Sequence, residues 1–132
     1  MLTGFGQSCI MEASQRATSH APGVAAEDAA CSALCADGWM ILARRRRTPA
    51  GEIDILAERD GLLAVVEVKA RARLAEAAVA VTPRQQARLL EATDLILAEN
   101  PHWGANGVRF DLLLVDAAGR VRRIADAFRR EG

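Results

Sequence analysis

Long apolar runs are missing from this sequence. None of its hydrophobic stretches approaches the roughly 18 residues that a membrane-spanning helix needs. Its first residues show no basic start followed by an apolar core, so we expect no secretory signal. Cysteine is scarce, with three residues in the chain. These absences predict a cytoplasmic protein without a membrane partner.

A net charge is also absent, because 17 basic residues balance 17 acidic ones. Composition therefore gives no support to nucleic-acid binding. Lysine is almost absent too, and the only one is Lys69, two residues after Glu67. Arginine is a planar fork whereas lysine is a compact point charge. A site that needs one ammonium group would distinguish the two, although chance placement is the alternative explanation.

The stretch Gly51–Lys69 organises the rest of the chain. It predicts two β-strands joined by a tight turn at 59–61, where aspartate precedes glycine. Residues two apart on a strand share a face. The first strand alternates, which predicts its acidic residues on one face and its isoleucines on the other. These are Glu52 and Asp54, and Ile53 and Ile55.

The second strand of this hairpin is apolar up to Val66 and then places Glu67 and Lys69 on one face. The hairpin therefore brings Asp54, Glu67 and Lys69 together at its open end. Two carboxylates and an ammonium group are costly to gather there unless a cation or a substrate uses them. An exposed cross-strand ion pair is the alternative for Glu67 and Lys69, because such surface pairs are common and contribute little.

Oxygen ligands of this kind suit Mg²⁺ or Mn²⁺. We expect Asp54, Glu67 and the backbone carbonyl of Val68 to bind the ion, with Lys69 beside it. The stretch holds no histidine or cysteine, which argues against zinc. It also holds no serine or cysteine nucleophile and no phosphate-binding glycine loop. A zinc site elsewhere would lack paired short spacings; its residues would be Cys9, His20, Cys31 and Cys35.

The remaining chain predicts one domain with the order α-β-β-β-α-β-β. Residues 1–22 lack periodicity and are expected to be a disordered arm, which leaves 23–132 as the domain. A mixed sheet of about five strands with a helix on each side is the expected α/β architecture. Besides the hairpin, we expect helices at 23–37 and 82–99, strands at 39–43, 109–115 and 121–124, and a basic loop at 44–50.

Glu27 lies beside the apolar stripe of the first predicted helix. Two interpretations are open for it. A glutamate in the first turns of a helix is favourable when solvated. The same residue could instead be a third acidic group facing the cluster on the strands.

Several motifs resemble the YraN family of small bacterial proteins. They are G-W-M-I-L-A-R, G-E-I-D, V-E-V-K-A-R, A-V-T-P-R and R-F-D-L. This resemblance implies a three-layer, restriction-endonuclease-like fold related to Holliday-junction resolvases and grouped with the PD-(D/E)xK nucleases. It implies that Asp54 and Glu67 are metal ligands, that Lys69 is catalytic, and that Glu27 and Glu52 assist.

The sequence departs from the family pattern at Arg45, where the family usually has asparagine, and at Gln85, near which it usually has lysine. We expect the nucleic-acid backbone to contact Arg45, Arg71, Arg73, Arg84 and Gln85. The expected function is metal-dependent hydrolysis of phosphodiester bonds in DNA, including branched DNA. A non-catalytic nucleic-acid-binding module and a protein-interaction domain with a surface acidic cluster are the alternatives. Junction-cutting relatives imply a homodimer.

Overall fold

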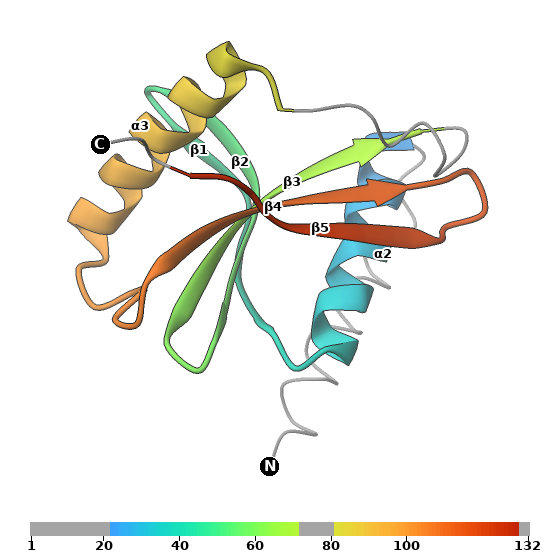
Figure 1. Cartoon of the computed structure of the whole chain (residues 1–132), viewed down its shortest axis with the longest axis horizontal. Helices are drawn as coiled ribbons and strands as arrows, with labels where there is room; N and C mark the ends of the chain where they lie inside the picture. The colour runs from blue at the N-terminus through green and yellow to red at the C-terminus, as the bar shows by residue number, and fades with distance from the viewer. Residues whose placement is uncertain (1–21, 72–80, 130–132) are drawn as a thin grey trace.

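The computed structural model describes residues 22–71 and 81–129. Figure 1 shows a sheet between two helices, which confirms the predicted order α-β-β-β-α-β-β. The predicted arm at 1–22 lies outside the described residues except for Pro22. Neither described helix is long and apolar enough to cross a membrane. The elements are α2 (Pro22–Ala36), β1 (Met40–Thr48), β2 (Gly51–Arg59), β3 (Leu62–Ala70), α3 (Pro83–Glu99), β4 (Val108–Val115) and β5 (Val121–Phe128).

The five strands form one sheet in the order β1-β2-β3-β4-β5. The neighbours β1–β2, β2–β3 and β4–β5 are antiparallel, whereas β3 and β4 are parallel. A parallel pair needs a crossover connection, and α3 lies in the connection between β3 and β4. The sheet is therefore mixed, as predicted.

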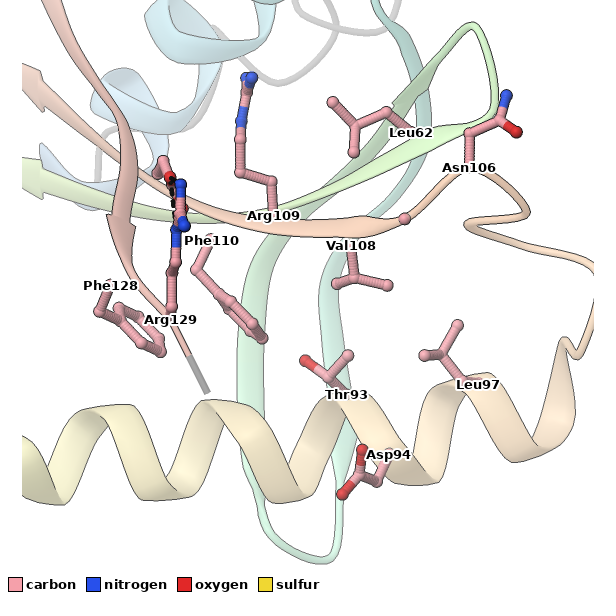
Figure 2. Close-up of a pocket in the computed structure, with 12 residues that line it drawn as sticks. Leu62, Thr93, Asp94, Leu97, Asn106, Val108, Arg109, Phe110, Phe128 and Arg129 are labelled. Carbon is pink, nitrogen blue, oxygen red and sulfur yellow. Dashed lines mark hydrogen bonds and ion pairs between the residues drawn. The ribbon is translucent and has the colours of Figure 1, made fainter. Parts of the chain in front are cut away.

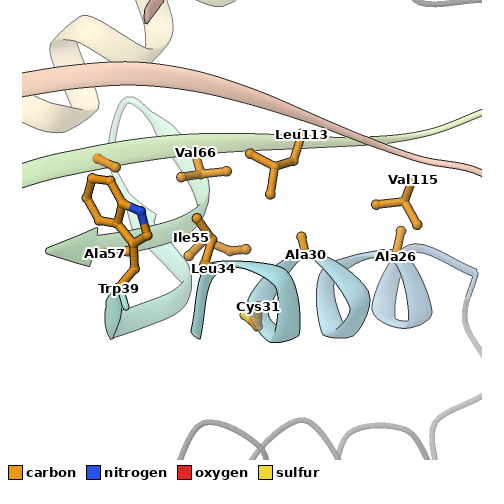
Figure 3. Close-up of a cluster of buried hydrophobic side chains, with 11 residues drawn as sticks. Ala26, Ala30, Cys31, Leu34, Trp39, Ile55, Ala57, Val66, Leu113 and Val115 are labelled. Carbon is orange, nitrogen blue, oxygen red and sulfur yellow. The ribbon is translucent and has the colours of Figure 1, made fainter. Parts of the chain in front are cut away.

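Each helix covers one face of the sheet. Small residues of α2, among them Ala26 and Ala30, pack on Val66 and Leu113, so the helix lies close to the strands (Figure 3). Cys31 is buried in the same cluster, as expected for a small apolar residue. The opposite face packs against α3 through Leu89, Ala92 and Ile96, together with Leu63, Val65, Leu112 and Leu114 of the sheet.

Local signals fixed two boundaries that the sequence predicted. The turn between β2 and β3 has positive φ angles of 53° at Asp60 and 79° at Gly61, which is the pattern of the turn that Asp-Gly favours in hairpins. The start of α3 carries a capping box, in which Thr82 accepts from the Gln85 N–H and Gln85 accepts from the Thr82 N–H.

The predicted basic loop at 44–50 is wrong, because β1 continues through the four arginines to Thr48. The hydroxyl oxygen of Thr48 then accepts hydrogen bonds from the N–H groups of Ala50 and Gly51, both at 3.1 Å, and closes a short turn. Long basic side chains suit an edge strand, where they discourage pairing with another chain. A run of arginine therefore does not exclude a strand.

The last strand is also longer than predicted and reaches Phe128. The ring of Phe128 stacks on that of Phe110 in β4, with centroids 4.6 Å apart. A bulge interrupts this pair of strands, where Asp126 has a positive φ of 56°. The N–H of Asp126 donates to Oδ1 of Asp111 at 2.9 Å, so a side chain replaces the missing backbone partner.

Candidate metal centre

The hairpin opens at the point where its acidic residues lie. Backbone pairing of β2 with β3 ends at Ile55 and Val66. Beyond it, the N–H of Val68 donates to Oδ2 of Asp54 at 2.8 Å. The Asp54 carboxylate therefore lies between the separating strands. The N–H and C=O of one residue in a strand point the same way, so the carbonyl of Val68 faces the same opening.

The predicted alternation in β2 is wrong at its start. Ile53 packs in the cluster that faces α3, whereas Ile55 packs in the cluster that faces α2. The strand changes face between them, opposite Arg45 of β1, whose left-handed φ of 49° breaks the regular pleat. Asp54 lies at this change, which explains why its carboxylate reaches across to β3.

Asp54 and Glu67 form a close carboxyl pair. Their side chains lie within hydrogen-bond reach of one another. Burial, mainly, raises the pKa of Asp54 from 3.8 to about 6; the N–H of Val68 opposes this shift, and the negative charge of Glu67 adds to it. Two ionised carboxylates in this position repel each other, and a cation between them would remove that cost.

Lys69 completes the cluster predicted from the hairpin. Its Nζ lies 3.7 Å from Oε2 of Glu67, and the two side chains are only 14% and 11% exposed. An exposed surface ion pair, the alternative interpretation, is therefore wrong. The structure brings together all three residues predicted for the centre.

Glu27 of α2 is buried, so the solvated alternative for this residue is wrong. Burial raises its pKa, against which the hydrogen bond and the charge of Arg45 act; the charge of Asp54 raises this pKa too. Oε1 of Glu27 accepts from Nε of Arg45 at 2.8 Å. Glu27 therefore faces the strand cluster from the helix layer, held there by an arginine.

Sequence reasoning missed a buried ion pair that fixes this helix. Nη2 of Arg44 donates to Oδ1 of Asp28 at 2.6 Å and lies 3.8 Å from Glu27. The Arg44 side chain is almost fully buried, although the sequence predicted a basic loop at this position. No local signal could have found the pair, because its partners lie 16 residues apart on different elements.

The other residues predicted for the centre are either exposed at its edge or bonded within the protein. Glu52 is exposed beside Arg47, with 3.6 Å between Oε2 and Nε, but its charge contributes to the raised pKa of Asp54. Arg45 is committed to Glu27, and its left-handed backbone is one that the asparagine of the family pattern adopts more easily.

The other predicted backbone contacts are dispersed. The side chain of Gln85 caps α3 through the Thr82 N–H at 2.9 Å. Arg84 is exposed on the first turn of α3. Arg71 donates to the carbonyl of Ala70 at 2.7 Å. Arg73 lies outside the described residues.

The donor set fits a hard divalent cation. Between 22 and 71 and between 81 and 129, no group of three or more histidine, cysteine or acidic side chains is arranged to hold a metal ion. An ion at this centre would have two carboxylates, Asp54 and Glu67, and the backbone carbonyl of Val68 as protein ligands. Water or substrate oxygens would fill its other coordination positions. Mg²⁺ is bound in this way in many phosphate-handling sites.

The structure gives no support to a zinc site that includes Cys31. Cys31 lies on α2 and is buried in the core between this helix and the sheet. Cys9 and His20 lie outside the described residues.

Comparison with known proteins decides the family. The model of the uncharacterised protein family UPF0102 matches residues 26–115. The chain belongs to UPF0102. A UPF0102 protein of Granulibacter bethesdensis is 63% identical over 107 residues, which cover 81% of this chain and 68% of the relative. UPF0102 relatives from Rhodopseudomonas palustris strain HaA2 and Azorhizobium caulinodans are 52% and 44% identical, covering 88% and 89% of this chain and 91% and 90% of theirs.

UPF0102 membership confirms the YraN-like family predicted from the motifs. The region matched by the family model contains Glu27, Asp54, Glu67 and Lys69, so the whole cluster belongs to the part shared with UPF0102. The family description names no reaction.

Replacing Asp54 with asparagine is expected to stabilise the metal-free UPF0102 protein at neutral pH. The pKa of Asp54 is higher in the folded protein than in the unfolded chain, so folding favours the protonated carboxyl group. The resulting contribution to the free energy of unfolding is fully present below about pH 4 and is lost as the pH rises through about 6. Asparagine retains an acceptor for the Val68 N–H but has no charge to lose. We expect a gain of roughly 1–2 kcal/mol above pH 7 and none near pH 4, measured by urea unfolding.

Proposed function

We propose that this protein is a Mg²⁺- or Mn²⁺-dependent endonuclease that hydrolyses phosphodiester bonds in DNA. The observation that carries the proposal is the Asp54–Glu67 carboxyl pair at the opening of the β2–β3 hairpin, with Lys69 3.7 Å from Glu67. The strand order and the flanking helices agree with the restriction-endonuclease-like fold that the motifs imply.

In this proposal, each residue has one role in hydrolysis. When bound, a Mg²⁺ or Mn²⁺ ion supplies positive charge to the phosphodiester and lowers the pKa of a water ligand. Asp54, Glu67 and the Val68 carbonyl would hold the ion. The Lys69 ammonium orients the attacking water and stabilises negative charge that develops on the phosphoryl oxygens. The water oxygen forms the new bond to phosphorus while the bond from phosphorus to the leaving oxygen breaks. The attacking water gives a proton to solvent, and the leaving oxygen takes one up from solvent.

Glu27 supports the centre from the other layer. Its carboxylate is buried beside the strand opening and is held by Arg45. From there its negative charge would add to that of Asp54 and would help to attract a cation. Glu52 is exposed on the outer side of Asp54 and adds negative charge at the rim.

A non-catalytic nucleic-acid-binding module is the second candidate. It rests on the departures from the family pattern at Arg45 and Gln85, whose side chains bond within the protein and so are not placed to position a substrate for cleavage. The third interpretation, a surface acidic cluster, fits poorly because Glu67 is buried. Binding without cleavage under any divalent metal, with an affinity that falls steeply as salt rises, would favour the second candidate.

The test is a cleavage assay on branched, single-stranded and linear duplex DNA of matched sequence. We expect cleavage with Mn²⁺ or Mg²⁺, and none after chelation. RNA of the same sequence tests the choice of nucleic acid. Paired nicks in branched DNA would require two centres and therefore a homodimer, which sedimentation of the bound complex would detect.

A further inference from the structure

A cavity lined by residues of β4, β5 and α3 lies away from the metal centre. Its volume is about 660 Å³, and Asp54, Glu67 and Lys69 do not line it. Figure 2 shows the cavity between β4 and α3, where Val108 and Phe110 point towards Thr93 and Leu97. This volume lies within the range of pockets that bind small molecules. Apolar side chains face inward, and charged groups lie at the rim.

Two stacked aromatic rings form one wall of the cavity. Phe110 and Phe128 lie with their centroids 4.6 Å apart and their planes 23° apart (Figure 2). Phe128 is only half-buried, and Val108 on the same side of the cavity is 37% exposed. Aromatic rings that remain accessible in a pocket are suited to stacking on a flat ligand.

The cavity lies on the face of the sheet to which the side chain of Glu67 points. Phe110 pairs laterally with Val65, and both pack in the cluster that faces α3. Val65 lies two residues before Glu67, so its side chain shares the face of Glu67. Phe110 and Glu67 are therefore separated by about 7 Å along the strand direction and by one strand spacing of about 4.8 Å across the sheet. A nucleotide next to the one being cut would span this distance.

The basic residues that line the cavity are paired with carboxylates. Arg129 donates to Asp126 through Nε at 2.8 Å, whereas the Arg109 guanidinium is bound to Asp111 on the other side of β4 (Figure 2). A phosphate gains little from such paired charges. The edge of a nucleobase, which carries both donors and acceptors, can pair with carboxylates and guanidinium groups alike.

We propose that the cavity between β4 and α3 binds a nucleobase extruded from the DNA strand, next to the phosphodiester that is cut. This inference rests on the proposed endonuclease function. The base stacks on the Phe128–Phe110 pair and presents its edge to the charged rim, while its phosphate stays outside. Unpaired bases are available in single-stranded and branched DNA, so the cavity would select these substrates over an intact duplex.

The first test uses a ligand that cannot be cleaved. Deoxyadenosine monophosphate is titrated into the metal-free protein, and the methyl NMR signals of Val108, Leu97 and Thr93 are followed. Deoxyribose 5-phosphate, which lacks the base, is the control ligand. We expect these signals to shift with the nucleotide and not with the sugar phosphate. Equal shifts with both ligands, or none with either, would overturn the proposal whatever the nuclease assay gives.

The second test compares two tryptophan substitutions at similarly exposed apolar positions. Val108→Trp fills the mouth of the cavity, whereas Leu95→Trp lies on α3 outside its lining; the two side chains are 37% and 39% exposed. Affinity for single-stranded DNA is measured in chelator, so that no cleavage occurs. We expect Val108→Trp to weaken binding at least about fivefold, the lower bound for one stacked base, and Leu95→Trp to leave it unchanged.

Phe128→Leu provides a check that does not depend on inserting a large ring. Leucine keeps an apolar side chain but removes the stacking face, so we expect a similar loss of affinity. Binding of both pocket variants at the wild-type level would overturn the base site. DNA cleavage by the wild-type protein would still stand in that case. Conversely, nucleotide shifts without cleavage would support the pocket and count against the nuclease.

Discussion

Lys69→Ala is expected to lower the rate of metal-dependent DNA cleavage by about 10²–10³-fold, as loss of one preorganised charge donor does in other enzymes. Lys69 is the only lysine of the chain, and its Nζ lies 3.7 Å from Oε2 of Glu67. Asp54→Ala is expected to remove cleavage altogether, because it deletes a metal ligand. Single-turnover rates with saturating Mn²⁺ measure both effects.

Two control variants separate chemistry from charge. Lys69→Arg keeps the positive charge but replaces a compact ammonium group by a planar fork, so we expect most of the loss to remain. Arg122→Ala removes an exposed basic residue of β5 and should leave the rate unchanged. Full activity in both Lys69→Ala and Asp54→Ala would show that the centre is assigned wrongly.

Asp111→Ala is expected to have the largest effect on stability, about 3–5 kcal/mol of unfolding free energy, which is typical when one partner of a buried pair is removed. The Asp111 side chain is fully buried. Its two oxygens accept from Nε and Nη2 of Arg109 at 2.8 and 2.9 Å, and Oδ1 also accepts from the Asp126 N–H. Alanine would leave a guanidinium group and a backbone donor without partners. Urea unfolding measures the difference.

A second aspartate, Asp37, serves as the matched control, because it shares Arg123 with Asp111, whose Oδ2 lies 3.7 Å from Nε of Arg123. Asp37 also accepts from Arg123, at 2.8 Å, but its side chain is 52% exposed. Exposed pairs contribute little because water screens them. We therefore expect Asp37→Ala to cost about 1 kcal/mol or less. Equal losses for Asp37→Ala and Asp111→Ala would mean that the burial of Asp111 does not determine its contribution.

The parts of the fold that the sequence predicted correctly depend on short-range chemistry. The hairpin turn follows from aspartate and glycine at 60 and 61, and the start of α3 follows from the capping box at Thr82. The candidate centre was predictable for the same reason. Asp54, Glu67 and Lys69 lie on strands joined by a short turn, so their spacing largely determines their proximity.

What the sequence could not show depends on contacts between distant elements. Burial of Arg44 requires Asp28 on α2, and burial of Asp111 requires the bulge at Asp126. The run of arginines resembled a loop because composition alone does not reveal an edge strand. The change of face between Ile53 and Ile55 follows from the conformation of the neighbouring strand, which alternation in one strand cannot predict.

The stacked ring pair of Phe110 and Phe128 also depends on a contact between distant elements. Phe110 and Phe128 lie 18 residues apart in the sequence and meet only because β5 continues to its last aromatic residue. The sequence predicted a strand that ended at Ile124. A register shift between β4 and β5 brings the two rings together, and no local pattern signals such a shift.

Calorimetric titration of Mn²⁺ into the wild-type protein and Asp54→Asn tests the metal centre most directly. Because the pKa of Asp54 is raised to about 6 and metal binding requires the carboxylate form, the wild-type affinity should strengthen as the pH rises through about 6. Asp54→Asn should bind far more weakly at every pH. Wild-type binding that is absent, or that is unchanged in Asp54→Asn, would contradict the assignment of this centre.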